Sequence, residues 1–493
     1  MQKAMVWYFQ DLTGKLFDTE FWVCSDFAPS DIDDDLKEYD LEHYDSDVVN
    51  EDGETMAMFG NAQSLAYHQS NSDDPYITFE DNEDENEERE ELQVLATDNM
   101  VVAAKVEDEV AHLEVYVYED EADNLYVHHD VMLPAIPLCV EWLDVPVGRA
   151  ITDPSVKGNY VAVGTMDPDI EVWDLDTIDC MYPNAILGQG NDEGKEEPGQ
   201  EKKRKKRKRS KKTNDDYHVD AVLSLAANRH HRNLLASASA DKTVKLWDLN
   251  ITKCAKSYSY HTDKVCSIAW HPSETTILLS GSYDRTIVAA DMRAPDDAKV
   301  PRWAVESDVE TVTWDPHDSN FFYVTTENGV IHYHDVRSVP ATPEYSRPVW
   351  TLQAHDESIA SFDVNPTIPG FLATGSMDKE VKLWNVQPSG PSMVVSRNLG
   401  VGKVFTTKFA PDLEVAFRLA VAGSKGAMQI WDTSTNPAIR GAFANRMAPI
   451  RGESKEERIV GVDADSSDSE EEGGIEPGSE ATAENGWESM EDE

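Results

Sequence analysis

The stretch LASASADKTVKLWDL, residues 235–249, decides the fold of this 493-residue chain because other parts of the chain repeat its pattern. It starts with apolar and small residues, continues to Asp241, and reaches Trp247 six positions later. Two further segments share the pattern: VAVGTMDPDIEVWDL (161–175, with Asp167 and Trp173) and LATGSMDKEVKLWNV (372–386, with Asp378 and Trp384). Self-similarity of this kind indicates a repeat architecture.

Three weaker copies keep the same six-residue spacing. Their paired positions are Asp284 with Ala290, Asn328 with His334, and Lys425 with Trp431. From residue 247, the second members of the pairs fall at residues 290, 334, 384 and 431, which gives spacings of 43, 44, 50 and 47 residues. Because a four-stranded propeller blade repeats every 40 to 50 residues or so, this spacing predicts a β-propeller.

Short apolar alternations recur in a second register and predict the innermost strand of each blade. They end at Trp142, Trp270, Trp314, Val364 and Phe409. Six blades follow, at residues 136–187, 219–258, 263–305, 308–352, 356–399 and 402–445, and residues 98–133 supply three strands of a seventh. An open ring would leave unpaired sheet edges, so the aromatic-rich segment 5–27 is the candidate for the missing innermost strand.

The expected fold class is therefore all-β, a seven-bladed propeller between disordered acidic N- and C-terminal segments. The acidic run EDNEDENEEREE at residues 80–91 cannot offset the entropy of ordering by burial. The expected divisions are an N-terminal segment at 1–91, which donates the closing strand, a propeller at 92–445 with a basic disordered insertion at 188–216, and an acidic disordered tail at 446–493.

A histidine precedes three of the predicted innermost strands, in HVDAV, HTDKV and HDESI. With the Asp and Trp positions these are the marks of WD40 repeats, in which the three side chains hydrogen-bond within a blade. The predicted structural residues are His218, Asp241 and Trp247 in one blade, His355, Asp378 and Trp384 in another, His261 and Asp284 in a blade left incomplete by Ala290, and Asp167, Trp173 and Trp431.

Composition and motifs argue against several function classes. The 94 Asp and Glu outnumber the 43 Lys and Arg, for a net charge of −51, which excludes attraction of nucleic acid by the whole surface. Five cysteines without a CxxC pair favour a reducing compartment. The sequence shows neither a signal peptide nor a run of about 20 apolar residues, so we expect no secretion and no membrane-spanning helix. No phosphate-binding loop, HExxH or GxSxG motif occurs. We therefore expect no catalytic residues, metal, cofactor or small-molecule substrate.

The stretch EKKRKKRKRSKK at 201–212 is a concentrated basic run in an acidic protein. Its charged residues are Lys202, Lys203, Arg204, Lys205, Lys206, Arg207, Lys208, Arg209, Lys211 and Lys212. Three interpretations are open: a nuclear import signal read by an import receptor, a contact with RNA phosphates, and a merely solvated loop. Import is favoured because no aromatic residues interleave with the basic ones to stack on bases.

Acidic segments lie at 31–47, 80–91 and 463–493. They are either solvating tails or a screen that binds basic partners such as ribosomal proteins or histones by charge complementarity. Ser466, Ser467 and Ser469 precede clustered acids and resemble acid-directed kinase sites, where each phosphate would add about −1.5 to −2 of charge. We therefore expect a phosphoprotein.

Four segments carry a resemblance to a known family: DLKEYDLEHYD (35–45), DPYITF (74–79), YVHHDVMLPAIPLCVEWLD (126–144) and GNYVAVGTMDPDIEVWDLD (158–176). They are similar to the signature segments of the periodic tryptophan protein family of nucleolar WD40 proteins, in the same order. This resemblance implies a noncatalytic assembly factor in the nucleus and nucleolus, active in rRNA processing and large ribosomal subunit assembly. The implied partners are assembly factors and ribosomal proteins in pre-ribosomal particles, and precursor rRNA. The alternative is a histone-binding regulator of rDNA transcription by RNA polymerase I.

Overall fold

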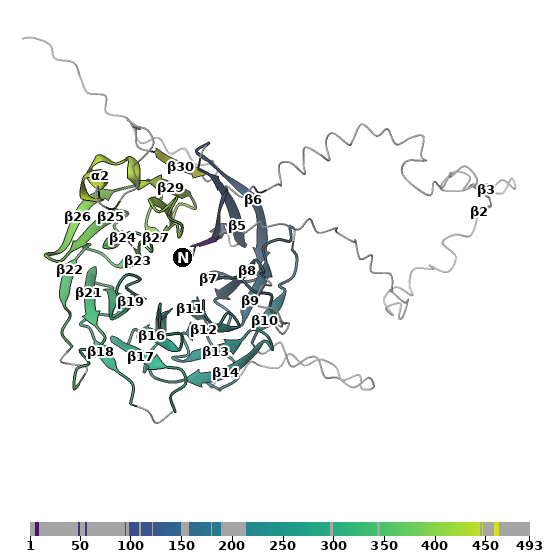
Figure 1. Cartoon of the computed structure of the whole chain (residues 1–493). Coiled ribbons are helices and arrows are strands. Elements are labelled where there is room, and N and C mark those ends of the chain that lie inside the picture. The colour runs from purple at the N-terminus through teal and green to yellow at the C-terminus, as the bar shows by residue number, and fades with distance from the viewer. Residues whose placement is uncertain are drawn as a thin grey trace, which may run out of the picture. The chain divides into compact units, whose positions relative to one another are not determined.

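The computed structural model describes residues 5–8, 48–49, 55–56, 94, 98–107, 110–120, 122–148, 157–178, 180–188, 213–295, 299–342, 346–443, 446 and 458–462. The chain divides into two units, one of Met1–Gln10 with Thr97–Glu493 and one of Asp11–Ala96. The first unit holds seven four-stranded antiparallel sheets arranged as the blades of a β-propeller (Figure 1). The predicted seven-bladed propeller is thus confirmed. The acidic segments 31–47, 80–91 and 463–493 lie outside the described residues, so their expected disorder stays a prediction.

The blades are numbered in chain order, and each runs from its innermost to its outermost strand. Blades one to three contain β1 (Met5–Tyr8), β4 (Asn99–Glu107), β5 (Val110–Glu119), β6 (Asn124–Leu133); β7 (Pro137–Leu143), β8 (Tyr160–Thr165), β9 (Ile170–Asp174), β10 (Ala185–Leu187); and β11 (Val222–Ala227), β12 (Leu234–Ser239), β13 (Val244–Asp248), β14 (Lys253–Tyr258). Blades four and five contain β15 (Val265–Trp270), β16 (Ile277–Ser282), β17 (Thr286–Asp291), β18 (Arg302–Ala304); and β19 (Val309–Trp314), β20 (Phe321–Thr326), β21 (Val330–Asp335), β22 (Trp350–Gln353). Blades six and seven contain β23 (Ile359–Val364), β24 (Phe371–Ser376), β25 (Val381–Gln387), β26 (Gly390–Arg397); and β27 (Val404–Phe409), β28 (Arg418–Gly423), β29 (Met428–Asp432), β30 (Arg458–Val462).

The remaining elements are short. The unit Asp11–Ala96 contains the hairpin of β2 (Val48–Val49) and β3 (Thr55–Met56). After β29, the 3₁₀ helix η7 (Thr433–Thr435) leads into α2 (Pro437–Phe443), whose Phe443 ring lies 4.5 Å from that of Phe371. No helix in the described part of the chain is long and apolar enough to cross a membrane.

The apolar core is divided among the interfaces between neighbouring blades. Trp247 of blade three packs with Val172 and Leu187 of blade two, and Trp431 of blade seven packs with Phe371 of blade six. At the corresponding interface of blades three and four, Ala290 stands where blades two, three, six and seven have Trp, and Tyr258 packs in the same cluster. Trp247, Ala290 and Trp431 therefore each pack between their own blade and the one before it.

Hydroxyl side chains connect the innermost strands across the blades. Ser224 Oγ accepts a hydrogen bond from the backbone N–H of Ile268 at 3.3 Å. Ser267 repeats this contact one blade later with Val312, at 3.1 Å. Because the innermost strand has a free edge, these bonds satisfy backbone donors that sheet pairing leaves open. They also fix the orientation of each blade relative to the next.

The innermost strand of blade one comes from the start of the chain. Met5–Tyr8 pairs with β4, and Met5 lies opposite Ala103. This strand falls within the segment 5–27 that the sequence indicated, whereas residues 9–27 lie outside the described part. Every sheet of the ring is therefore four-stranded, including the one that is incomplete at 98–133.

The last blade extends beyond the boundary at residue 445 that the sequence indicated. Its outermost strand is Arg458–Val462, which pairs with β29 so that Val462 lies opposite Met428. The assignment of 446–493 entirely to a disordered tail is therefore wrong for these five residues. The stretch RIVGV is too short to show a clear period and follows the polar residues ESKEE, so only its pairing with β29 reveals it.

Candidate functional site: the polar networks and rims of the propeller

In blade three, one chain of hydrogen bonds joins the predicted Trp, His and Asp. Trp247 Nε1 donates to Ser237 Oγ at 2.8 Å, and Ser237 Oγ lies 2.7 Å from His218 Nε2. His218 Nδ1 lies 2.9 Å from Asp241 Oδ2, and Thr243 Oγ1 donates to Asp241 Oδ1 at 2.6 Å. The chain ties the loop before β11, the β12–β13 turn and β13 to one another.

Blade six repeats the arrangement with a threonine in place of the serine. Trp384 Nε1 donates to Thr374 Oγ1 at 3.0 Å, which lies 2.8 Å from His355 Nε2. His355 Nδ1 lies 2.7 Å from Asp378 Oδ2. The sequence reasoning did not name Ser237 or Thr374, although both stand ten positions before the Trp, and that spacing could have identified them.

Burial and hydrogen bonding decide where the protons lie in the network of blade three. Burial lowers the pKa of His218 and outweighs the opposing effect of Asp241, so the imidazole is neutral at pH 7. Burial alone would raise the pKa of Asp241, but hydrogen bonds from His218 and Thr243 outweigh it and lower the pKa to about 2. The neutral ring therefore donates from Nδ1 to the carboxylate and accepts from the hydroxyl at Nε2.

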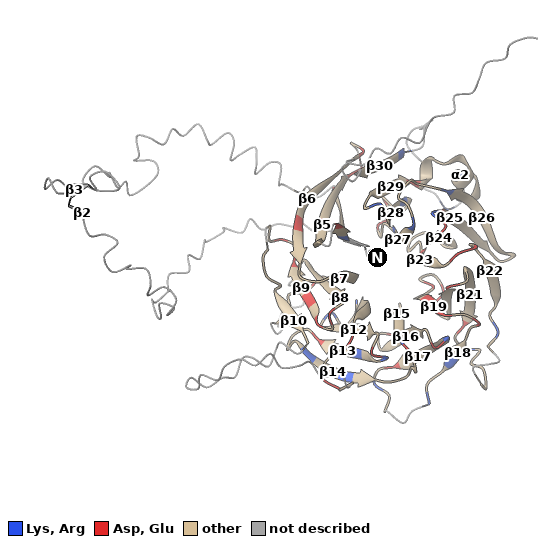
Figure 2. Cartoon of the chain, turned by 180° about the vertical axis from the view of Figure 1, so that it is seen from behind, with Lys and Arg blue, Asp and Glu red and all other residues tan. Residues whose placement is uncertain are grey.

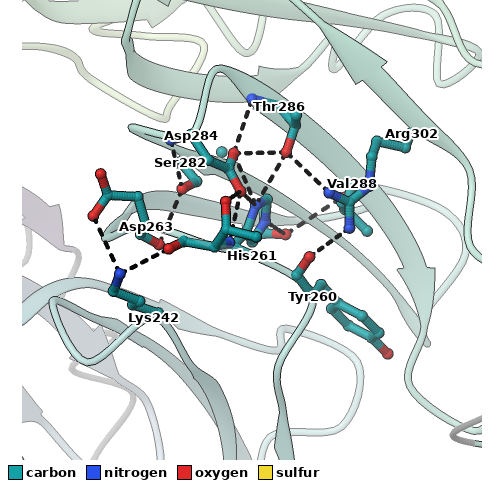
Figure 3. A network of polar contacts seen from close by, with 12 residues as sticks. Lys242, Tyr260, His261, Asp263, Ser282, Asp284, Thr286, Val288 and Arg302 are labelled. Carbon is teal, nitrogen blue, oxygen red and sulfur yellow. Dashed lines mark hydrogen bonds and ion pairs between the residues drawn. The ribbon is translucent and has the colours of Figure 1, made fainter. Parts of the chain in front are cut away.

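Blade four keeps the contacts of the histidine with the serine and the aspartate, but it has Ala290 in place of the Trp (Figure 3). His261 Nδ1 lies 3.2 Å from Asp284 Oδ2, and His261 Nε2 lies 2.9 Å from Ser280 Oγ. Arg302 extends this network, since it donates to the backbone carbonyl of Tyr260 and lies 3.4 Å from Thr286 Oγ1. The loop is therefore held from its outer side as well.

Blades two and seven keep the Trp but not the histidine. In blade two, Trp173 Nε1 donates to Glu171 Oε2 at 3.2 Å, and Asp167 donates its backbone N–H to Thr165 Oγ1 at 3.1 Å. Trp173 is thus bonded to a glutamate of its own strand, β9. In blade seven, the buried Trp431 Nε1 has no hydrogen-bond partner among the described residues. The Trp side chains act there mainly through packing.

In blade five, His334 occupies the Trp position of the frame. Its ring stacks on Phe322, with centroids 5.3 Å apart and planes 16° apart, and its side chain is buried. Its Nε2 lacks a hydrogen-bond partner within the described residues. Burial, with a smaller effect from His332, lowers the pKa of His334 to about 4. The histidine therefore serves as a neutral aromatic wedge at pH 7.

The order Ser237, His218, Asp241 resembles the triad of serine hydrolases, and burial decides against that function. Ser237 is 0% exposed and His218 is 1% exposed. The serine oxygen also accepts the Trp247 indole N–H, so a substrate carbonyl could not approach it. We assign the network a structural role.

A second set of side chains fixes the opposite rim, and sequence reasoning missed it. Each of these side chains follows an innermost strand and donates to a carbonyl in the next blade. Asn228 Nδ2 lies 2.7 Å from Thr275 O, and His317 Nε2 lies 2.8 Å from Asn365 O. Asn365 Nδ2 continues the series to Ala416 O at 2.7 Å. Because the residue type varies between Asn and His, no single motif reveals the series.

The loop after β11 carries the exposed pair His230 and His231 beside Arg229. Asn228 Oδ1 accepts their backbone N–H groups at 3.0 and 2.8 Å, so the loop has a fixed shape. No group of three or more His, Cys, Asp and Glu side chains within the described ranges could hold a metal ion. The basic run at 202–212 and Ser466, Ser467 and Ser469 lie outside the described residues, and their roles stay predictions.

Comparison with known proteins finds WD40 repeats in this chain and several similar proteins. The family model described as "WD domain, G-beta repeat" (WD40) matches residues 211–248, 252–289 and 346–385. An uncharacterized WD repeat-containing protein of Schizosaccharomyces pombe is 51% identical over 446 residues, which are 89% of this chain and 82% of that protein. Periodic tryptophan protein 1 of Saccharomyces cerevisiae is 39% identical over 87% of this chain and 80% of its own length. Its homolog in Drosophila melanogaster is 30% identical over 73% of each chain.

Proposed function

We propose that this chain, which belongs to the periodic tryptophan protein 1 family, is a noncatalytic scaffold for assembly of the large ribosomal subunit. The family relationship is consistent with ribosome biogenesis, and the WD40 propeller is a fold of protein–protein interaction. Within ribosome biogenesis, we infer that the protein acts in rRNA processing and that it does so in the nucleolus.

The observation that carries this proposal is the fixed geometry of both rims. On one rim, the His218–Asp241 and His355–Asp378 pairs hold the loops between blades. On the other rim, Asn228 and Asn365 each connect their own blade to the next one. A partner that binds such a surface does not have to order it first, so little entropy is lost on association. This suits a platform on which other proteins assemble.

The charge of the chain supports basic partners. A net charge of −51 favours fast, salt-sensitive association with positively charged proteins, a class that includes ribosomal proteins. The basic run at 202–212 then has a separate role, which we infer to be recognition by a nuclear import receptor. The run lies between Leu187, where blade two ends, and Val222, where blade three starts. Changes in its sequence therefore remove no side chain from the propeller core.

A second candidate function uses the same features. Histone tails are also basic, so a chromatin regulator of rDNA transcription by RNA polymerase I would benefit from the same acidic charge. We favour the assembly factor because a rigid platform with two fixed rims suits several partners at once.

Affinity purification followed by sucrose-gradient sedimentation tests the proposal. We expect the tagged full chain to sediment with large pre-ribosomal particles and to bring down their precursor rRNAs. Co-isolation of nucleosomes in the absence of such particles would overturn the first function in favour of the second. Sedimentation as the free protein, with neither, would reject both.

A further inference from the structure

Blade seven replaces the buried His–Asp pair with a glycine and a lysine. Lys425 stands six positions before Trp431, where blade three has Asp241 before Trp247. The Ser424 N–H donates to Lys403 O as the Ala240 N–H donates to Ala221 O, so Gly400 takes the position of His218, three residues earlier. Lys425 is exposed, whereas Asp241 is buried. Six positions before its Trp, blade seven thus has an exposed ammonium group where blade three has a buried carboxylate.

A neighbouring turn places a second lysine without a carboxylate partner. Lys242, Arg285 and Lys379 all have left-handed backbones, with φ of 73°, 63° and 71°, at the same turn of blades three, four and six. Lys242 donates to Thr262 O at 2.7 Å and lies 3.9 Å from Asp263, and Arg285 lies 2.9 Å from Asp308. In both cases the partner belongs to the loop that enters the next blade.

The loop that follows blade six offers Lys379 no such partner. Residues 398–403 read NLGVGK and contain no Asp or Glu, whereas the loops that enter blades four and five supply Asp263 and Asp308. Lys379, Lys403 and Lys425 are all exposed, and none forms an ion pair with any residue that the structure describes. We name these three residues the lysine rim. Figure 2 shows the charged residues of the propeller, with Lys and Arg in blue and Asp and Glu in red.

Backbone hydrogen bonds hold two parts of the lysine rim together. The Lys403 N–H donates to Ser424 Oγ at 3.0 Å, and the Ser424 N–H donates to Lys403 O at 2.8 Å. The Lys425 N–H donates to Val401 O at 3.1 Å. A Cβ atom on Gly402 would lie 2.4 Å from Ser424 Oγ, so glycine permits this close approach. The two lysine backbones are therefore fixed side by side.

The last strand of the propeller ends beside this rim. Val462, the end of β30, lies opposite Met428, and Met428 is only three positions after Lys425. Because residues 425–427 lie in the turn between β28 and β29 and each residue spans at most about 3.6 Å, Lys425 lies within about 11 Å of the level of Met428 and Val462. The next ten residues, DADSSDSEEE at 463–472, contain six Asp and Glu and no Lys or Arg. Extended, ten residues span up to about 35 Å.

We propose that the acidic segment 463–472 binds the lysine rim of its own chain. The tether at Val462 gives the segment an effective concentration of order millimolar at the rim, so even weak ion pairs suffice for occupancy. The bound segment neutralises the three ammonium groups and screens them from other acidic ligands, including nucleic acid. Phosphates on Ser466, Ser467 or Ser469 would tighten the contact, because each adds about −1.5 to −2 of charge.

Binding of a separate peptide to the full chain tests this proposal. A labelled peptide of sequence DADSSDSEEE is titrated, by fluorescence anisotropy at low salt, with the wild-type chain and with a full-length variant in which the six acidic residues of 463–472 are changed to Asn and Gln. We expect the neutralised variant to bind the peptide at least about tenfold more tightly, because its own segment no longer competes. Equal affinities for the two proteins would overturn the proposal.

Substitutions in the neutralised variant locate the site. Lys379→Gln, Lys403→Gln and Lys425→Gln together should abolish peptide binding, whereas the matched set Lys253→Gln, Lys299→Gln and Arg347→Gln, exposed residues of other blades, should leave it unchanged. If both sets weaken binding equally, the attraction is diffuse and the lysine rim is not the site. If a single-stranded RNA probe binds through the lysine rim and the peptide does not, the surface serves nucleic acid and the proposal is wrong.

Discussion

Arg418 in the last blade lies 2.6 Å from Asp120 in the first, although 298 positions separate them in the chain. Arg418 also lies 2.6 Å from Asp432, and Arg458 pairs with Asp123 in the same region. Apolar residues of both blades, among them Tyr118 and Met428, pack in one cluster here. No sheet in the described part of the chain combines strands of the first and last blades, so side chains, and not a shared strand, connect these two blades there.

Arg418→Gln should therefore destabilise the protein strongly. The substitution leaves Asp432, whose side chain is 4% exposed, without its closest cation. Loss of one partner of a buried ion pair costs about 3 to 5 kcal/mol. The free energy of unfolding, from denaturant titration, measures the effect. Arg285→Gln, which removes an exposed pair with Asp308, is the control and should cost less than about 1 kcal/mol. Equal costs for the two variants would contradict a ring closed at Arg418.

Trp247→Phe should cost more than Trp431→Phe. Both indoles are fully buried wedges between blades, so the two substitutions remove the same volume. Only Trp247 loses a hydrogen bond, the one to Ser237, since Trp431 Nε1 has none among the described residues. We expect the difference in unfolding free energy to be about 1 kcal/mol. A larger cost at Trp431 would show that packing, and not the polar network, distinguishes these blades.

Stability should fall as the pH is lowered from 7 to 5, in part because of His334. The folded-state pKa of about 4 lies below the ordinary value of 6.5, so the unfolded chain binds a proton in this interval and the folded chain does not. Proton uptake by the unfolded state alone favours unfolding. One pKa unit corresponds to about 1.4 kcal/mol, so His334 contributes a loss of about 2 kcal/mol by pH 5.

His334→Phe is the variant that checks this assignment, because Phe keeps an aromatic ring against Phe322 and cannot titrate. Unfolding free energies of both proteins are compared at pH 7, 6 and 5. The variant should lose less stability on acidification than the wild type. His218 and His355 have lowered pKa values through burial too, so some pH dependence should remain. Parallel pH curves for the two proteins would rule out His334 as a contributor.

Replacement of every Lys and Arg in 202–212 by Gln should leave the fold intact, because the propeller strands end at Leu187 and resume at Val222. If the run is an import signal, the variant should remain in the cytoplasm. An unrelated import signal at the N-terminus should then restore both nucleolar accumulation and rRNA processing. Restored entry with persistent processing defects, seen by microscopy and precursor-rRNA blots, would instead favour an RNA contact through lost phosphate interactions.

The sequence was sufficient for the fold because the wedges and loop anchors recur at fixed spacing. Asp241, Trp247 and His218 are recognisable at their spacings before the structure is known. The bridges between blades are different: Asn228 and His317 perform the same task with different side chains, so only their contacts identify them.

The end of the propeller was also beyond sequence reasoning. Arg458–Val462 becomes a strand because it pairs with β29, a contact that depends on the folded sheet and not on local pattern. The lysine rim was hidden for a similar reason. Lys425 was visible as a departure from the repeat, but its neighbours and the nearby end of β30 became apparent only in three dimensions.

Acute depletion of the protein with pulse labelling of rRNA tests the central claim most directly. An assembly scaffold predicts that synthesis of the primary rRNA transcript continues while mature large-subunit rRNA fails to appear and its precursors accumulate or decay. Small-subunit rRNA should mature normally over the first labelling period. The contrary result is an immediate fall in primary transcript synthesis with normal processing of the transcripts that remain, which would identify a regulator of transcription.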